Sequence, residues 1–281
     1  MQTPELSIVI RAYNAEPFIV ETMLSAVRQN PLPRGHEIIV VNDGSTDLTL
    51  KIVTGIQEQL PRDFVRIIST DNRGEAAAAN TGVAAARAKN ILFLDSDDLL
   101  DPQASHVLSQ GLEICCVASG EKRGFRSGKR GETIFTYSPA KSKKAQLRKP
   151  SDKPEGLYYL HANILGAPRA FRKSDYERTG GSDERMRVAD DYDLGLRLVF
   201  PGIDMPVFIS DHVIFYHRQL AGSQSSSNRT LQSYEAETAI NRAFSRLGIS
   251  GLKASAAGRD DTGYLYFEHV PIQSESSVVL S

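Results

Sequence analysis

The sequence is poor in cysteine and has no long apolar run. Its two cysteines are the neighbours Cys115 and Cys116. Backbone geometry disfavours a disulfide between adjacent residues, so we expect two buried, reduced thiols that serve packing. No apolar run approaches the roughly 18 residues that a membrane-spanning helix needs, and the first residues, MQTPELSIVIR, lack the basic, apolar and small-residue order of a signal peptide. These absences predict a cytoplasmic protein without a transmembrane segment.

The chain also lacks an excess of charge of either sign. It has 33 Lys and Arg against 34 Asp and Glu, a formal net charge of -1, which gives no general reason to expect nucleic acid or an anionic membrane as a partner. No G-x-G-x-x-G follows the first predicted strand, which excludes a dinucleotide-binding fold of that type. With 41% hydrophobic and 24% charged residues over 281 positions, the chain is typical of one large globular domain, or of one domain with an appendage.

Short apolar runs alternate with helix-like stretches in the first hundred residues. The runs are rich in β-branched residues and lack polar alternation, as expected of strands buried on both faces of a parallel sheet; they span residues 6–10, 37–41, 65–69 and 91–94. Helices are predicted to begin near Pro17, after DGSTD (43–47) and at the alanine-rich stretch 75–88. This alternation predicts an α/β fold with a mainly parallel, doubly wound sheet and flanking helices.

Polar residues gather where three of these strands end. The first strand leads into RAYN (11–14), the second into NDGSTD (42–47) and the fourth into DSDD (95–98). The carboxyl ends of parallel strands meet at one edge of a sheet, which is the usual ligand site of such folds. The sequence therefore predicts one site built from all three segments.

The DSDD cluster places like charges close together, and these repel one another. It needs a compensating cation, such as a divalent metal, or a capping role at the helix predicted near Pro102. An EF-hand is excluded because Leu100 and His106 stand where its loop needs glycine and an acid. A haloacid-type phosphatase is disfavoured, because such an enzyme prefers Thr or Val where Leu99 stands.

The second half of the chain is less regular. Residues 120–155 are basic and rich in Gly, Ser and Pro. They predict a long solvated loop or hairpin containing the strand-like ETIFTYS (132–138), with a basic flap over an anionic ligand as the alternative. Beyond them we expect a strand and short helix over 164–181, a helix over 189–200, a strand pair over 204–218, a helix over 230–247 and a loose tail.

Five segments, in this order, resemble a family 2 glycosyltransferase of the GT-A fold. They are LSIVIRAYNAEPFIVETMLSAVRQ, EIIVVNDGSTDLT, DNRGEAAAANTGVAAARAKNILFLDSDDLLDP, GGSDERMRVADDYDLGLRL and HRQLAGSQS. The resemblance implies a GT-A domain over residues 1–225, with a nucleotide-binding half (1–110), an acceptor half (160–225), the 120–155 insertion and a C-terminal extension (226–281). It implies an inverting enzyme that moves a monosaccharide from a UDP- or dTDP-sugar to an acceptor hydroxyl in glycan or polysaccharide assembly.

The resemblance also assigns roles to individual residues. Asp97 would be the direct ligand of a Mg²⁺ or Mn²⁺ ion, which stabilises the leaving nucleoside diphosphate as a Lewis acid, and Asp95 would contact the ribose or the metal. Asp43 would read the base, since an aspartate that accepts from a ring N–H suits uracil or thymine, and Tyr13 would stack on that base. Asp191 matches the general base that removes the acceptor proton. The other donor-site residues implied are Asn14, Asn72, Gly74, Asn80 and Ser96.

The sequence departs from the family pattern at three positions. Arg11 stands where Pro is common, Ala79 where Arg is common, and Leu220 where His is common, with His217 as a candidate substitute. A phosphate- or base-proximal cation is therefore expected at Arg11 or Arg73. Two other functions stay open: a sugar-1-phosphate nucleotidylyltransferase, whose glycine-rich turn is missing here, and an inactive GT-A-like module that binds nucleotide sugars.

The expected partners follow from the same assignments. They are a nucleotide-sugar donor and a glycan or lipid-linked acceptor, not nucleic acid. The lysines and arginines between residues 122 and 149 suggest peripheral contact with the inner face of a membrane. Asp190, Asp191 and Asp193 also suit the first turn of a helix, whose dipole favours acids. We assign function to Asp191 and this structural role to the other two.

Overall fold

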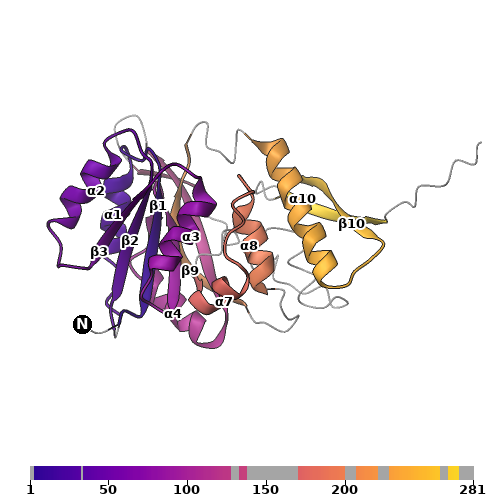
Figure 1. Ribbon diagram of the computed structural model, residues 1–281, viewed down its shortest axis with the longest axis horizontal. Helices are drawn as coiled ribbons and strands as arrows, with labels where there is room; N and C mark the ends of the chain where they lie inside the picture. The colour runs from indigo at the N-terminus through magenta and orange to yellow at the C-terminus, as the bar shows by residue number, and fades with distance from the viewer. Residues whose placement is uncertain are drawn as a thin grey trace, which may run out of the picture.

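The computed structural model describes residues 3–32, 34–127, 133–137, 170–199, 207–220, 228–259 and 265–271. The chain forms an α/β structure around one large mixed sheet (Figure 1). In chain order the strands of this sheet are β1 Leu6–Ala12, β2 His36–Asp43, β3 Val65–Thr70, β4 Asn90–Asp95, β5 Leu99–Leu100, β6 Val117–Ser127, β7 Thr133–Tyr137, β8 Ala170–Arg172 and β9 Val207–Arg218. Their spatial order is β3-β2-β1-β4-β8-β6-β9-β5, with β7 paired to β6.

Strands β1 to β4 form the parallel half of the sheet, as predicted. Strand β1 pairs in parallel with β2 on one side and with β4 on the other, and β3 pairs with β2. The register places Ala12 opposite Asn42 and Arg11 opposite Asp95. The segments RAYN, NDGSTD and DSDD therefore start at one edge of the sheet, which confirms their predicted convergence.

The second half of the sheet corrects one expectation. Residues 204–218 were expected as a strand pair, but β9 is one strand. Its register against β6 jumps from Gly120↔Ser210 to Glu121↔Val213, so the polar residues that suggested a turn form a β-bulge instead. Residues 120–127, expected in a long loop or hairpin, continue β6, which forms an antiparallel hairpin with β7 and pairs in parallel with β9. Most of the basic segment after residue 137 lies outside the described residues.

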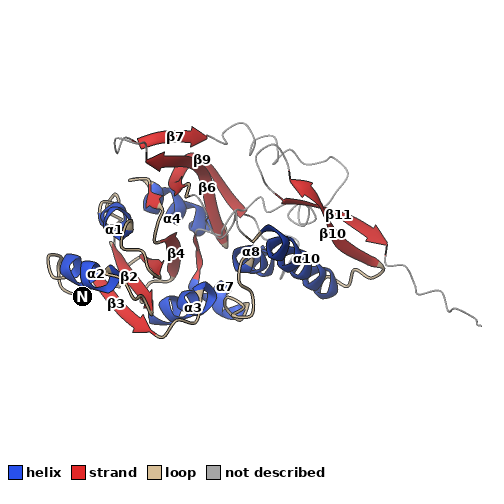
Figure 2. Ribbon diagram, turned by 90° about the horizontal axis from the view of Figure 1, so that it is seen from above, coloured by secondary structure: helices blue, strands red, loops and turns tan. Residues whose placement is uncertain are grey.

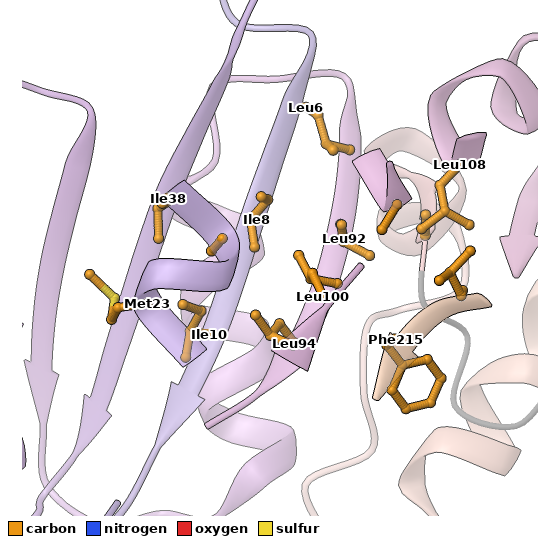
Figure 3. Close-up of a cluster of buried hydrophobic side chains, with 14 of the residues drawn as sticks. Leu6, Ile8, Ile10, Met23, Ile38, Leu92, Leu94, Leu100, Leu108 and Phe215 are labelled. Carbon is orange, nitrogen blue, oxygen red and sulfur yellow. The ribbon is translucent and has the colours of Figure 1, made fainter. Parts of the chain in front are cut away.

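Helices cover both faces of the sheet (Figure 2). Helices α1 Ile19–Val27, α2 Thr49–Gln57 and α4 Ala104–Ile114 lie on one face, and α3 Glu75–Ala85, α7 Lys173–Arg178 and α8 Asp190–Val199 lie on the other. Side chains alternate along β1, so Ile8 and Ile10 pack with Met23 and Leu108 (Figure 3), while Val9 packs on α3. A Cβ on Gly82 would lie 2.3 Å from Val9 Cγ1, so this close packing requires glycine.

A third layer lies outside α8. Helix α10 Arg229–Arg246 packs against α8, and the hairpin of β10 Leu252–Arg259 and β11 Leu265–Pro271 covers α10. The domain boundary expected near residue 225, and the tail after residue 271, lie outside the described residues. Among the described helices, none combines the length and apolarity of a membrane span. Cys115 and Cys116 are both buried and free, as predicted, and burial raises the pKa of Cys116 to about 11.

Candidate active site

A cavity of about 710 Å³ opens at the carboxyl ends of β1 and β2. One side comes from the ends of these strands and the loop before α3. The opposite side comes from the loop before α8 and the first residues of α10. The residues that line it include Arg11, Tyr13, Asp43, Asn72, Arg73, Gly74, Glu75, Ser96, Glu184, Met186, Arg187, Val188, Asn228 and Leu231. The cavity therefore joins segments that are more than 200 residues apart in the sequence.

Asp43, the last residue of β2, lines this cavity and is almost completely buried. Its carboxylate accepts hydrogen bonds from the backbone N–H of Arg73 (3.0 Å) and Gly74 (2.8 Å) and from Thr70 Oγ1 (3.2 Å). A carboxylate has about four acceptor sites, so about one remains for a ligand. Gly44 follows with a φ of 72°, and a Cβ there would lie 2.7 Å from Asn72 N. Asp43 thus holds the 70–74 loop as well as facing the cavity.

The other residues predicted for the nucleotide end divide into two groups. Tyr13 is 51% exposed and lines the cavity, so its ring is open to a ligand. Asn14 is used within the protein: its Oδ1 accepts the N–H of Thr46 at 2.8 Å, and its own N–H donates to Ser45 Oγ at 3.0 Å. Asn72, Gly74 and Ser96 line the cavity. Asn14 therefore ties the RAYN segment to the NDGSTD loop.

Asn80 also acts within the protein rather than in the cavity lining. Its Oδ1 accepts from Tyr176 Oη (2.6 Å) and from the N–H of Ser182 (2.9 Å), and its Nδ2 donates to Glu184 Oε1 at 3.0 Å. Glu184 in turn pairs with Arg73 at 2.6 Å. The predicted donor residue Asn80 is thus placed where it joins α3 to the loop before α8.

The three aspartates of the DSDD cluster have three different environments. Asp95 pairs with Arg11. Asp98 is buried and accepts the N–H of Arg218 at 2.9 Å, with His217 Nδ1 3.4 Å away. Asp97 is half-buried and forms no ion pair among the described residues; burial, with the negative charges of Asp98 and Asp95, raises its pKa to about 6. Asp97 is therefore the aspartate of the cluster without an ion pair in the described part of the chain, although the charge of His217 acts to lower its pKa.

Arg11 connects the DSDD cluster to helix α8. Its guanidinium pairs with Asp95, lies 3.6 Å from Asp190 Oδ2 and stacks over Phe93 at 5.3 Å. Burial acts to lower the pKa of Arg11, but the charges of Asp95, Glu75 and Asp190 outweigh it and raise that pKa. The predicted cation at Arg11 is present, and it is paired within the protein.

Glu75, the first residue of α3, was not among the predicted site residues. It is open to the cavity, yet protein atoms surround its other sides. That loss of water, together with the charges of Asp95, Asp190 and Asp191, raises its pKa to about 7 against the effect of Arg11. An acid at the start of a helix directly after the 72–74 loop was the available sequence signal.

Three acids, Asp190, Asp191 and Asp193, lie in the first turn of α8, as predicted. Asp190 is buried against Arg11, and burial raises its pKa. Asp193 is buried and pairs with Arg197 at 2.7 Å. Asp191 is half-buried, and its Oδ1 accepts the N–H of Tyr192 at 2.7 Å. Asp190 and Asp193 are thus both held in ion pairs with arginines of the described part of the chain.

The donor atoms around Asp97 suit a hard divalent cation. Among the described residues no three His, Cys, Asp or Glu side chains are grouped to hold a metal. Mg²⁺-like ions usually bind one or two protein carboxylates together with substrate phosphates, so a complete protein shell is not required. His217, the candidate substitute for the missing histidine, has its Nδ1 3.4 Å from Asp98 Oδ2. Residues 221–225 of the HRQLAGSQS segment lie outside the described residues. The residues present fit a metal that arrives with a diphosphate.

The comparisons agree with this geometry. The family described as Glycosyl transferase family 2 matches residues 7–171. Chondroitin synthase of Escherichia coli is 31% identical over 259 residues, which are 90% of this chain and 34% of that protein, so the chain spans about a third of that relative.

Two solved structures resemble the fold. S. aureus TarS 1–349 in complex with UDP-GlcNAc has a TM-score of 0.63 at 18% identity, covering 85% of this chain and 66% of that chain. Mannosyltransferase PcManGT from Pyrobaculum calidifontis in complex with GDP-Man and Mn²⁺ has a TM-score of 0.61 at 19% identity, covering 86% and 64%. With its sheet of GT-A type and a family match over more than half of its length, the chain belongs to glycosyl transferase family 2.

Proposed function

We propose that this glycosyltransferase moves a monosaccharide from a UDP- or dTDP-linked donor to an acceptor hydroxyl, with inversion, in polysaccharide assembly. The observation that carries the proposal is the cavity itself. Tyr13, Asp43, Arg11 and Glu75 all line it, and the charges of Asp95, Asp190 and Asp191 act on Glu75. A donor that spans this cavity would place its sugar beside α8.

The nucleotide end favours a pyrimidine with a ring N–H. Asp43 keeps about one acceptor site for that N–H, since the 70–74 loop uses the others. Tyr13 is exposed in the cavity and offers an aromatic face to the base. The name of the TarS complex includes UDP-GlcNAc, and that of PcManGT includes GDP-Man. The preference of this enzyme for one nucleobase over the other is therefore the feature to test.

The reaction end needs charge stabilisation and a base. Asp97, with Asp95, would hold a divalent ion, which supplies Lewis-acid stabilisation of the leaving diphosphate when bound. Asp191 would take the proton of the acceptor hydroxyl, a role that contributes about 10² to 10⁴ in rate. Asp190 is buried, with its Oδ2 3.6 Å from Arg11 Nη1, so we assign the base to its neighbour Asp191.

The acceptor is proposed to be a growing glycan or a lipid-linked saccharide. Support comes from the chondroitin synthase relative, which shares 31% identity with this chain. Of the basic segment, the described residues Lys122 and Arg123 are half-buried on β6, and Arg126 is exposed. Peripheral contact with an anionic membrane through the rest of that segment remains part of the proposal.

Calorimetric titration with UDP, dTDP and GDP tests the base assignment directly. We expect UDP or dTDP to bind more tightly than GDP, and Asp43→Asn to weaken UDP binding about tenfold, because a hydrogen bond to a charged group contributes about 1.5 to 3 kcal/mol. Asp47→Asn is the matched control, since Asp47 accepts backbone N–H groups of Glu16 and Thr49 at the end of the same loop. Tighter binding of GDP, or equal losses in both variants, would refute the assignment.

A further inference from the structure

The loop before α8 is held by helix α10 at both of its ends. We call residues 183–189 the cavity-wall segment. At its start, Arg242 Nη1 donates to Asp183 Oδ2 at 2.9 Å. At its end, the Glu235 carboxylate accepts the backbone N–H groups of Arg187, Val188 and Ala189. Figure 1 shows α10 lying alongside α8, so the helix and the segment form one packed unit.

The contact at Glu235 is the stronger of the two. Its side chain is buried, and its oxygens lie 3.0 Å from Arg187 N, 2.9 Å from Val188 N and 3.1 Å from Ala189 N. Hydrogen bonds from amides to a carboxylate are charge-assisted and about twice as strong as neutral ones. These three consecutive N–H groups precede the helix, so they have no helical partner and depend on Glu235. One side chain therefore fixes three successive peptide groups.

The cavity-wall segment carries most of one side of the cavity. Glu184, Met186, Arg187 and Val188 all line it. Asp190 and Asp191 follow directly in the chain, so any movement of the segment also moves these acids. The N-terminal end of α10 contributes Asn228 and Leu231 to the same lining. The donor cavity is thus completed by a helix that lies beyond the family match, which ends at residue 171.

We infer that Glu235 is a positioning residue for catalysis: by holding the backbone of residues 187–189, it sets the cavity wall and the place of Asp191. The side chain of Glu235 is buried and is not among the residues that line the cavity. This inference rests on the proposed function for its kinetic part, while its structural part stands independently. A misplacement of about 1 Å in a catalytic group can cost about 10²-fold in rate, so a loosened segment should affect turnover more than nucleotide binding.

The test compares Glu235→Gln with Glu237→Gln in the full chain. Glu237 is on the same helix and accepts the N–H of Ala256 at 2.6 Å, on the hairpin side away from the cavity. For each variant we would measure amide hydrogen exchange by mass spectrometry, thermal unfolding, UDP affinity by calorimetry, and kcat and KM for sugar transfer. If Glu235→Gln does not fold, Glu235→Asp replaces it, because its shorter carboxylate cannot reach all three N–H groups.

We expect Glu235→Gln to speed exchange at residues 187–189 and to lower kcat about tenfold to a hundredfold, with UDP affinity within about twofold of wild type. Glu237→Gln should leave exchange at 187–189 and kcat unchanged, even where it lowers the melting temperature equally. Unchanged exchange at 187–189 in Glu235→Gln, or an equal loss of kcat in both variants, would overturn the inference. If wild type transferred no sugar, the proposed function would fail, and the exchange data would still decide whether Glu235 holds the segment.

Discussion

Replacing Arg11 by methionine removes the cation that joins the DSDD cluster to α8 while keeping an apolar side chain over Phe93. The guanidinium is about one-tenth exposed, as is Asp190, whereas Asp95 is 34% exposed. Removing one partner of a buried ion pair costs about 3 to 5 kcal/mol. The exposure of Asp95 puts the expected loss at the lower end, about 3 kcal/mol at pH 8. For a chain of this size that is a fall in melting temperature of about 6 °C.

This loss should depend on pH. Without Arg11, the folded-state pKa values of Glu75 and Asp190 rise further above their unfolded values. A carboxyl whose folded pKa is raised stabilises the protein below its unfolded pKa, and that contribution disappears as the pH rises through the folded pKa. The pKa of Glu75 is already about 7 in the wild type. The deficit of Arg11→Met should therefore be small at pH 5 and grow steadily to pH 8.

Denaturant unfolding in metal-free buffer at pH 5, 6.5 and 8 measures this deficit, with Arg66→Met as the matched control. Arg66 Nη1 lies 3.7 Å from Glu37 Oε2, far from the cavity. Burial acts to raise the pKa of Glu37, but hydrogen bonds from Ser7 and Arg87 outweigh it and lower that pKa. Glu37 thus stays ionised from pH 5 to 8, and the control deficit should be constant. A constant deficit for Arg11→Met as well would refute the electrostatic reasoning.

Three further predictions concern the same site. Glu75→Gln should stabilise the free protein by about 1 kcal/mol at pH 8, after allowance for its exposure, and by much less at pH 5, as measured by thermal unfolding. Asp97→Asn should abolish the part of UDP binding that depends on Mn²⁺, which calorimetry with and without a chelator detects. Asp191→Asn should lower the kcat of transfer by about 10² while leaving donor affinity near wild type, and normal transfer in that variant would move the base to another residue.

The parallel half of the fold and the position of the site could be predicted because both depend on local pattern. Uninterrupted β-branched runs identify strands β1 to β4, and parallel strands must end at a common edge. Polar residues at the ends of three such strands therefore lie close together, independently of the fold of the rest of the chain. The error at residues 204–218 arose where local pattern is ambiguous, because a β-bulge and a turn both interrupt a strand with polar residues.

The partners of individual side chains could not be predicted in this way. Arg11 was recognised as a departure from the family, but its pairing with Asp190 joins residues 179 positions apart. Glu235 gave no sequence signal, since a glutamate on a predicted helix is most often solvated. Asn80 was assigned to the donor from its motif, whereas its hydrogen bonds to Tyr176 and Ser182 depend on how two loops meet. Such contacts are decided by tertiary packing.

The pairing of Arg11 with Asp95 also helps to explain how three aspartates within four residues can be tolerated at the end of a buried strand. A proline at position 11 could not balance Asp95, whereas the arginine does so before any ligand binds. Asp98 is stabilised separately by the N–H of Arg218 and by His217. These two solutions leave Asp97, with a pKa raised to about 6, as the carboxylate that gains most from a cation. The three aspartates therefore differ in their surroundings: Asp95 and Asp98 have cationic or N–H partners within the fold, whereas no ion pair of Asp97 is found in the described part of the chain.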